Sequence, residues 1–170
     1  MADKYLKVGT TGNLEEVEAI VTSLGEGSAG EIPALDATGK LDDSVMPAGI
    51  GAEVVVLPAS EALAENDVVN IWDDTGTTKV QKAKASDATK PGHGYVKAAV
   101  ESAANATVYT DGYLPGTSLT IGSKYFLSAA TGGLVTTTPP AATGNIAQVI
   151  GVAVSATEIK FEPLTPILRA

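Results

Sequence analysis

Short apolar runs alternate with turn-forming residues from residue 53 to residue 161 of this chain. The separators, such as Asp73-Asp74-Thr75-Gly76 and Asp111-Gly112, have the composition of tight β-turns. Many short strands at regular spacing are typical of antiparallel sandwiches and barrels. The expected strands are 53–57, 67–72, 77–83, 94–100, 106–110, 124–128, 133–137, 146–154 and 158–161, with one helical turn within 60–66. We therefore predict a mainly β fold with little helix, in which an antiparallel β-sandwich or barrel-like body follows an extended N-terminal arm.

The first part of the chain differs in composition, and we predict an N-terminal arm, residues 1–51, ahead of a β-rich body, residues 52–170. Gly, Pro and Asp punctuate residues 27–51, which is typical of extended chain around a turn, here at 36–39. Isolated apolar side chains on such a segment need a cover from a neighbouring surface or another subunit. The side chains expected to make these contacts are Ile32, Leu35, Leu41, Val45, Met46 and Ile50.

Two interpretations stay open for residues 14–24. Apolar side chains recur there at helical spacing, at Leu14, Val17, Val21 and Leu24, with an Asn before the segment and a Gly after it as caps. A strand with alternating faces fits so short a segment almost as well.

The charge of the chain bears on its partners. Eleven Lys and Arg residues stand against 20 Asp and Glu residues, for a formal net charge of −9, and Arg169 is the only Arg. Such a field repels phosphate, and Arg is the usual residue for clamping it, so we expect no nucleic-acid partner. No apolar run approaches the roughly 20 residues of a membrane span, and the first residues lack a signal core. We expect no membrane partner and synthesis in the cytoplasm.

No residue pattern predicts an enzyme. Without Cys, thiol catalysis is excluded, and the single His, His93, has no evident nucleophile or metal-binding neighbours. A calcium loop beginning at Asp36 fails because its third and fifth places hold Thr38 and Lys40. We therefore predict no catalytic residue, no metal and no cofactor.

The aromatic residues have two possible uses. A carbohydrate-stacking set could be built from Trp72, Tyr95, Tyr109, Tyr125 and Phe126. Each falls within an expected strand, where packing is the commoner use of an aromatic ring. We expect Trp72 and Tyr125 in the core of the body.

Seven stretches of the sequence carry a resemblance to a known family: 30–42, 45–51, 59–63, 67–72, 79–83, 122–128 and 150–155. The first contains the phrase Leu35-Asp36-Ala37-Thr38-Gly39-Lys40-Leu41-Asp42. Together they resemble the capsid decoration proteins of tailed bacteriophages, also called cement or head-fibre-like proteins. The resemblance implies a non-enzymatic structural protein, typically a homotrimer, that binds the outer capsid surface of the virion. It would stabilise the shell by bridging subunits of the major capsid protein, its main partner besides itself.

Two other hypotheses are kept. The phrase at residues 35–42 also occurs in tail-fibre and other virion proteins, so the alternative is a tail- or head-fibre component that binds a host receptor or glycan. Exposed aromatic rings around Trp72 or Tyr113 would mark such a module. The third hypothesis is a carboxylate-type enzyme that hydrolyses a surface polysaccharide.

Overall fold

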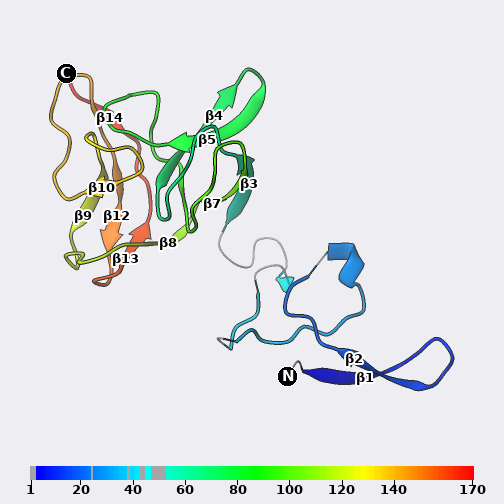
Figure 1. The fold of residues 1–170 in the computed structure, drawn as a ribbon. Helices are drawn as coiled ribbons and strands as arrows, with labels where there is room; N and C mark the ends of the chain where they lie inside the picture. The colour runs from blue at the N-terminus through cyan, green and yellow to red at the C-terminus, as the bar shows by residue number, and fades with distance from the viewer. Residues whose placement is uncertain (1–2, 24, 38, 43–44, 47–52) are drawn as a thin grey trace. The chain divides into compact units, whose positions relative to one another are not determined.

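The computed structural model describes residues 3–23, 25–37, 39–42, 45–46 and 53–170. The chain divides into two compact units, Met1–Gly51 and Ala52–Ala170 (Figure 1). Within the described residues the regular structure is almost entirely antiparallel strand, and the helical content is of the 3-10 type, at η1 (Gly25–Ser28) and at Val45. The predicted mainly β fold with antiparallel sheets is confirmed.

The N-terminal unit contains a two-stranded antiparallel sheet, made of β1 (Lys4–Val8) and β2 (Leu14–Glu18). Of the two interpretations of residues 14–24, the helix is wrong, and the strand covers only the first part of the segment. Residues 14–18 form a strand and not a helix because they pair with β1. The strand β1 itself was not predicted.

A five-stranded antiparallel sheet forms the first half of the body, and we call it the first sheet. Its spatial order is β3 (Val54–Pro58), β7 (Asn105–Tyr109), β6 (Gly94–Val96), β4 (Val68–Asp74) and β5 (Thr77–Lys82). Directly after β3, Ala59 forms a parallel bridge with Val80 of β5, and the Ser60 amide donates to the Val80 carbonyl at 2.8 Å. The two edges of the first sheet therefore meet at this point.

One face of the first sheet encloses a small apolar cluster of its own. Its buried members are Ala59, Leu63, Val69, Val80, Val96, Ala106 and Val108. Leu63 exchanges two backbone hydrogen bonds with Val100, at 2.8 and 2.9 Å. The helical turn expected at 60–66 is therefore wrong: the segment stays extended because these long-range hydrogen bonds and the burial of Leu63 outweigh its local preference.

The second sheet also has five antiparallel strands. Its spatial order is β10 (Val135–Thr136), β9 (Lys124–Leu127), β12 (Val149–Ala153), β13 (Glu158–Phe161) and β8 (Gly112–Pro115). A short pair, β11 (Ile146–Ala147) and β14 (Ile167–Leu168), stands beside it. The register between β12 and β9 shifts between Val149 and Gly151, which marks a bulge at the fully buried Ile150.

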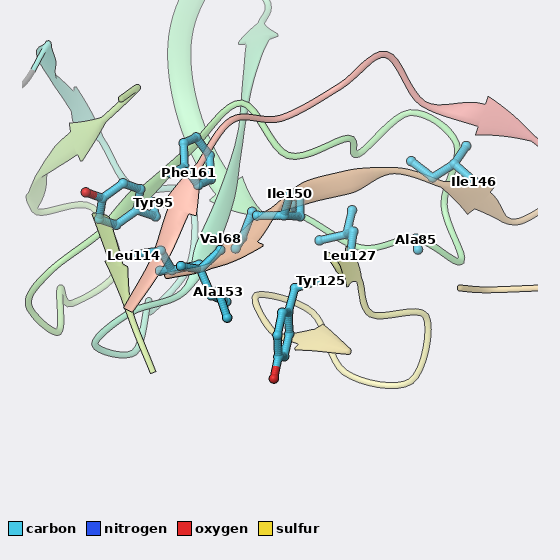
Figure 2. Packing of buried hydrophobic residues seen from close by; sticks show 12 residues of the cluster. Val68, Ala85, Tyr95, Leu114, Tyr125, Leu127, Ile146, Ile150, Ala153 and Phe161 are labelled. Atoms are coloured by element: carbon cyan, nitrogen blue, oxygen red, sulfur yellow. The ribbon is translucent and has the colours of Figure 1, made fainter. Parts of the chain in front are cut away.

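The main core of the body draws on both sheets (Figure 2). Val68 and Tyr95 of the first sheet belong to the same cluster as Leu114, Ile150 and Phe161 of the second sheet. The ring of Tyr95 packs on that of Phe161 with centroids 5.0 Å apart and on that of Tyr109 at 5.4 Å. These ring contacts make Tyr95 a central element of the core.

Of the two aromatic residues expected in the core, Tyr125 is buried there and Trp72 is not. Tyr125 is 7% exposed and belongs to the main cluster. Trp72 is half-buried and belongs to neither cluster. The reason lies in the pairing of β4: β6 pairs with it only at Val68 and Val69, so Trp72 lies in the part of the strand paired with β5 alone.

A polar network holds the loop that precedes β6. The buried side chain of Gln148 accepts a hydrogen bond from the Gly92 amide at 2.7 Å and donates to the Gly92 carbonyl at 2.9 Å. Asn70 donates to the Pro91 carbonyl at 2.9 Å, and Nδ1 of the exposed His93 accepts from the Ile71 amide at 3.1 Å. Gln148 also separates β11 from β12, which explains why the single strand expected at 146–154 is two strands.

Tyr95 should titrate late. Burial raises the pKa of its hydroxyl to about 12, with a smaller contribution from Tyr109. In an ultraviolet titration, one tyrosinate step is therefore expected about two pH units above the ordinary value near 10, and Tyr95→Phe should remove it. The raised pKa also links folding to pH: the neutral Tyr95 hydroxyl contributes its full share to the free energy of unfolding below about pH 10, the pKa of the residue in the unfolded chain. This contribution is lost as the pH rises toward 12. A wild-type titration without this late step would contradict the expectation.

Candidate interaction surface

The described residues of the N-terminal unit form no buried core. No described residue before Ala59 is buried. Its exposed large apolar side chains are Leu6, Val8, Leu14, Val21, Ile32, Leu35, Leu41 and Met46. A two-stranded sheet without a covered face is marginally stable in water, so this unit has the properties of a surface that another molecule covers.

The β1–β2 hairpin closes around the loop Gly9-Thr10-Thr11-Gly12-Asn13. The Gly9 amide donates to the Asn13 carbonyl at 2.8 Å, and the Gly12 amide donates to the Gly9 carbonyl at 3.0 Å. Gly12 has a φ of 83°, a conformation that most other residues adopt only with strain. The resulting register places Val8 opposite Leu14.

Three apolar side chains gather on one face of this hairpin. Because paired residues lie on the same face and successive residues alternate, Leu6, Val8 and Leu14 share a face. They are 67%, 66% and 69% exposed, while Tyr5 and Val17 on the other face are half-buried. We call Leu6, Val8 and Leu14 the hairpin face. An exposed ion pair between Lys4 and Glu16 borders it and contributes little to stability.

The extended segment that follows carries the side chains predicted from the sequence. It runs beside Ile20, whose amide donates to the Ile32 carbonyl at 3.1 Å and whose carbonyl accepts from the Ala34 amide at 2.8 Å. The expected turn is present: the Asp36 amide donates to the Lys40 carbonyl at 2.7 Å, and the Lys40 amide donates back to Asp36 Oδ1 at 3.0 Å.

The predicted contact residues have different surroundings. Ile32, Leu35, Leu41 and Met46 are exposed, and Val45 is half-buried. Ile50 lies outside the described residues. That these side chains contact a capsid or another subunit stays a prediction.

The hairpin face was missed by the sequence reasoning. The signal was present: Leu6 and Val8 flank Lys7, and the turn formers Gly9-Thr10-Thr11-Gly12-Asn13 follow directly. Leu14 also begins a segment that fits a helix, so the sequence alone does not indicate its pairing with Val8.

The rest of the described chain offers little that resembles a reaction centre. Among these residues no group of three or more His, Asp and Glu side chains could hold a metal ion, and no helix has the length and apolar character needed to cross a bilayer. A hydrogen bond from Lys160 at 2.7 Å lowers the pKa of Asp111, and one from Thr89 lowers that of Asp87. Comparison with protein families, with curated proteins and with solved structures finds no match to this chain.

Proposed function

We propose that this chain is a capsid decoration (cement) protein of a tailed bacteriophage. It binds the outer surface of the head and stabilises the shell by bridging subunits of the major capsid protein. The observation that carries the proposal is the N-terminal unit, whose described residues include eight exposed large apolar side chains and no buried residue. The resemblance of the sequence to such proteins supplies the identity of the partner.

The physical properties of the chain suit that role. Apolar side chains on a unit without a core gain stability when a neighbouring surface covers them. A homotrimer would present three such units at once, and repeated weak contacts then hold firmly through their high effective concentration. A net charge of −9 lets the protein coat a shell without binding free nucleic acid.

A head- or tail-fibre component that binds a receptor or glycan is the second candidate. One observation favours it: Tyr113 on β8 is 51% exposed, as expected for a ring that contacts a ligand. Trp72, the other aromatic residue named for this role, is half-buried.

Copy number separates the two candidates. Quantitative mass spectrometry of purified virions of the encoding phage should give close to one copy of this chain per major capsid subunit. A few copies per particle would favour the fibre component. Absence of the chain from the particles would contradict both candidates.

A further inference from the structure

One edge of the β1–β2 hairpin is open among the described residues. The Ala19 amide donates to the Asp3 carbonyl at 2.8 Å, so the backbone groups of Asp3 face β2. Because backbone groups point alternately to the two sides of a strand, the odd-numbered residues of β1 face β2 and the even-numbered residues face away from it. In the described part of the chain, the amides and carbonyls of the even-numbered residues make no further backbone hydrogen bond. They form what we call the β1 edge: Lys4, Leu6 and Val8.

The outer edge of β2 is less available to a second strand. Its continuation at Ile20 is already hydrogen-bonded to the Ile32 carbonyl and the Ala34 amide of the extended segment. Two-fold pairing of residues 14–18 with a second copy would also bring Glu side chains opposite each other, for example Glu16 against the Glu16 of that copy. Like charges directly opposite destabilise a sheet, so self-pairing at β2 is disfavoured.

The β1 edge, in contrast, is complementary to a second copy of itself. When two β1 strands run antiparallel about a two-fold axis at Leu6, all five residues of each strand are paired. Lys4 then lies opposite Val8 of the second copy, and Leu6 lies opposite its own counterpart. Tyr5 lies opposite Lys7 of the second copy, where a cation can contact an aromatic ring. No like charges face each other, and the even-numbered pairs bring amides and carbonyls within hydrogen-bonding reach.

Such pairing would stabilise the N-terminal unit. A two-stranded sheet is marginally stable in water, whereas three or more strands with an apolar face can be stable. The paired hairpins make a four-stranded sheet, and one side of it carries the hairpin faces of both copies. Strand pairing uses the backbone edge and leaves this apolar side free, so the sheet can still contact the capsid.

We propose that the β1 edge pairs with the β1 edge of a second copy of this chain, and that the shared four-stranded sheet joins neighbouring copies on the shell. The inference rests on the proposed function, because the shell holds the copies at high effective concentration. Three hairpins cannot all pair two by two within one homotrimer, so the pairs would link neighbouring trimers. The decoration layer would then be a connected net.

A single introduced Cys tests the pairing, because the chain has no Cys of its own. Leu6→Cys places two thiols on directly opposite residues, whose Cα atoms are about 5.5 Å apart in a hydrogen-bonded pair and within disulfide range. Leu14→Cys is the matched control: Leu14 is 69% exposed against 67% for Leu6 and shares the hairpin face, but it lies on β2. In the paired sheet, two Leu14 positions are beyond disulfide reach. Shells decorated with each variant are oxidised and analysed by non-reducing gel electrophoresis.

We expect about tenfold more disulfide-linked dimer per bound chain from Leu6→Cys than from Leu14→Cys. Co-sedimentation of the wild type and both variants first measures binding to the shells. Absence of binding by the wild type would refute the proposed function, and the pairing with it. Bound Leu6→Cys protein without the excess of dimer would overturn the pairing and leave the proposed function standing. A disulfide formed only between the two variants in a mixed sample would mean that β1 pairs with β2 of the second copy, which would also overturn it.

A second pair of variants tests whether the backbone edge makes the contact. In the Leu6→Cys chain, Val8→Pro removes an outward amide that β2 does not use, so the hairpin keeps its own hydrogen bonds. Val8→Thr retains that amide and is the control. The Pro variant should give about fivefold less dimer per bound chain than the Thr variant, because each copy loses a hydrogen bond to the other. Equal yields would refute the assignment to the β1 edge.

Discussion

Replacement of Leu6, Val8 and Leu14 together by Thr is expected to lower the affinity of the protein for undecorated capsid shells about a hundredfold or more. The three side chains form the hairpin face and are 66–69% exposed, so they are available to a partner in the free protein. Thr keeps the β-propensity of the strands and removes most of the apolar surface. Co-sedimentation of the protein with shells that lack it measures the change.

The matched control carries Thr at Val54 and Val56, which are 49% and 58% exposed on β3 of the body. It removes exposed apolar groups of the same kind from the other unit and should bind shells normally. Neither variant should change the unfolding of the body, because no substituted residue is buried. Normal shell binding by the hairpin variant would show that the hairpin face is not the contact, and the proposed function would then depend on the extended segment alone.

Phe161→Ala is expected to lower the free energy of unfolding of the body by about 3–5 kcal/mol. Phe161 is 1% exposed and packs on the ring of Tyr95 with centroids 5.0 Å apart. Its removal leaves a cavity in the main core where both sheets contribute side chains. Domains are typically stable by only about 5–15 kcal/mol, so the loss should be evident as a much lower urea midpoint. The single Trp, Trp72, lies in the body and provides the fluorescence signal.

Phe126→Ala is the control for this variant. Phe126 is also on the second sheet, but it is half-buried and does not belong to the main cluster. Phe126→Ala should lower the free energy of unfolding clearly less than Phe161→Ala does, because folding removes less of the Phe126 side chain from water. Equal losses for the two variants would mean that the core is not centred on the Tyr95–Phe161 contact.

The strands of the body were largely predictable because their signals are local. Residues 158–161 were assigned as a strand and form β13 with the same ends, and the Asp73–Gly76 turn joins β4 to β5 as expected. Side-chain alternation and turn chemistry involve neighbours in the sequence, so they can be recognised without knowing the fold. β8 was missed because it is short and lies among Gly and Pro residues, and β14 because it has two residues and directly follows Pro166.

Three features could not be predicted in this way. Residues 60–66 stay extended because Leu63 pairs with Val100, and Trp72 stays half-buried because β6 ends its pairing with β4 at Val69. The strand at residues 14–18 depends on β1 as its partner. In each case, pairing with a segment that is distant in the sequence, or that was not predicted to be a strand, decided between local conformations of similar free energy.

By itself, the sequence determined that the chain forms short antiparallel strands, that a turn follows Asp36, and that apolar side chains recur on a segment with little to cover them. Only the tertiary structure decided which strands pair, which apolar residues share the hairpin face, and which backbone groups form the β1 edge. The physical reason is that periodicity specifies which side of a strand is apolar, whereas the choice of partner depends on long-range packing and on the entropy of closing the intervening loops.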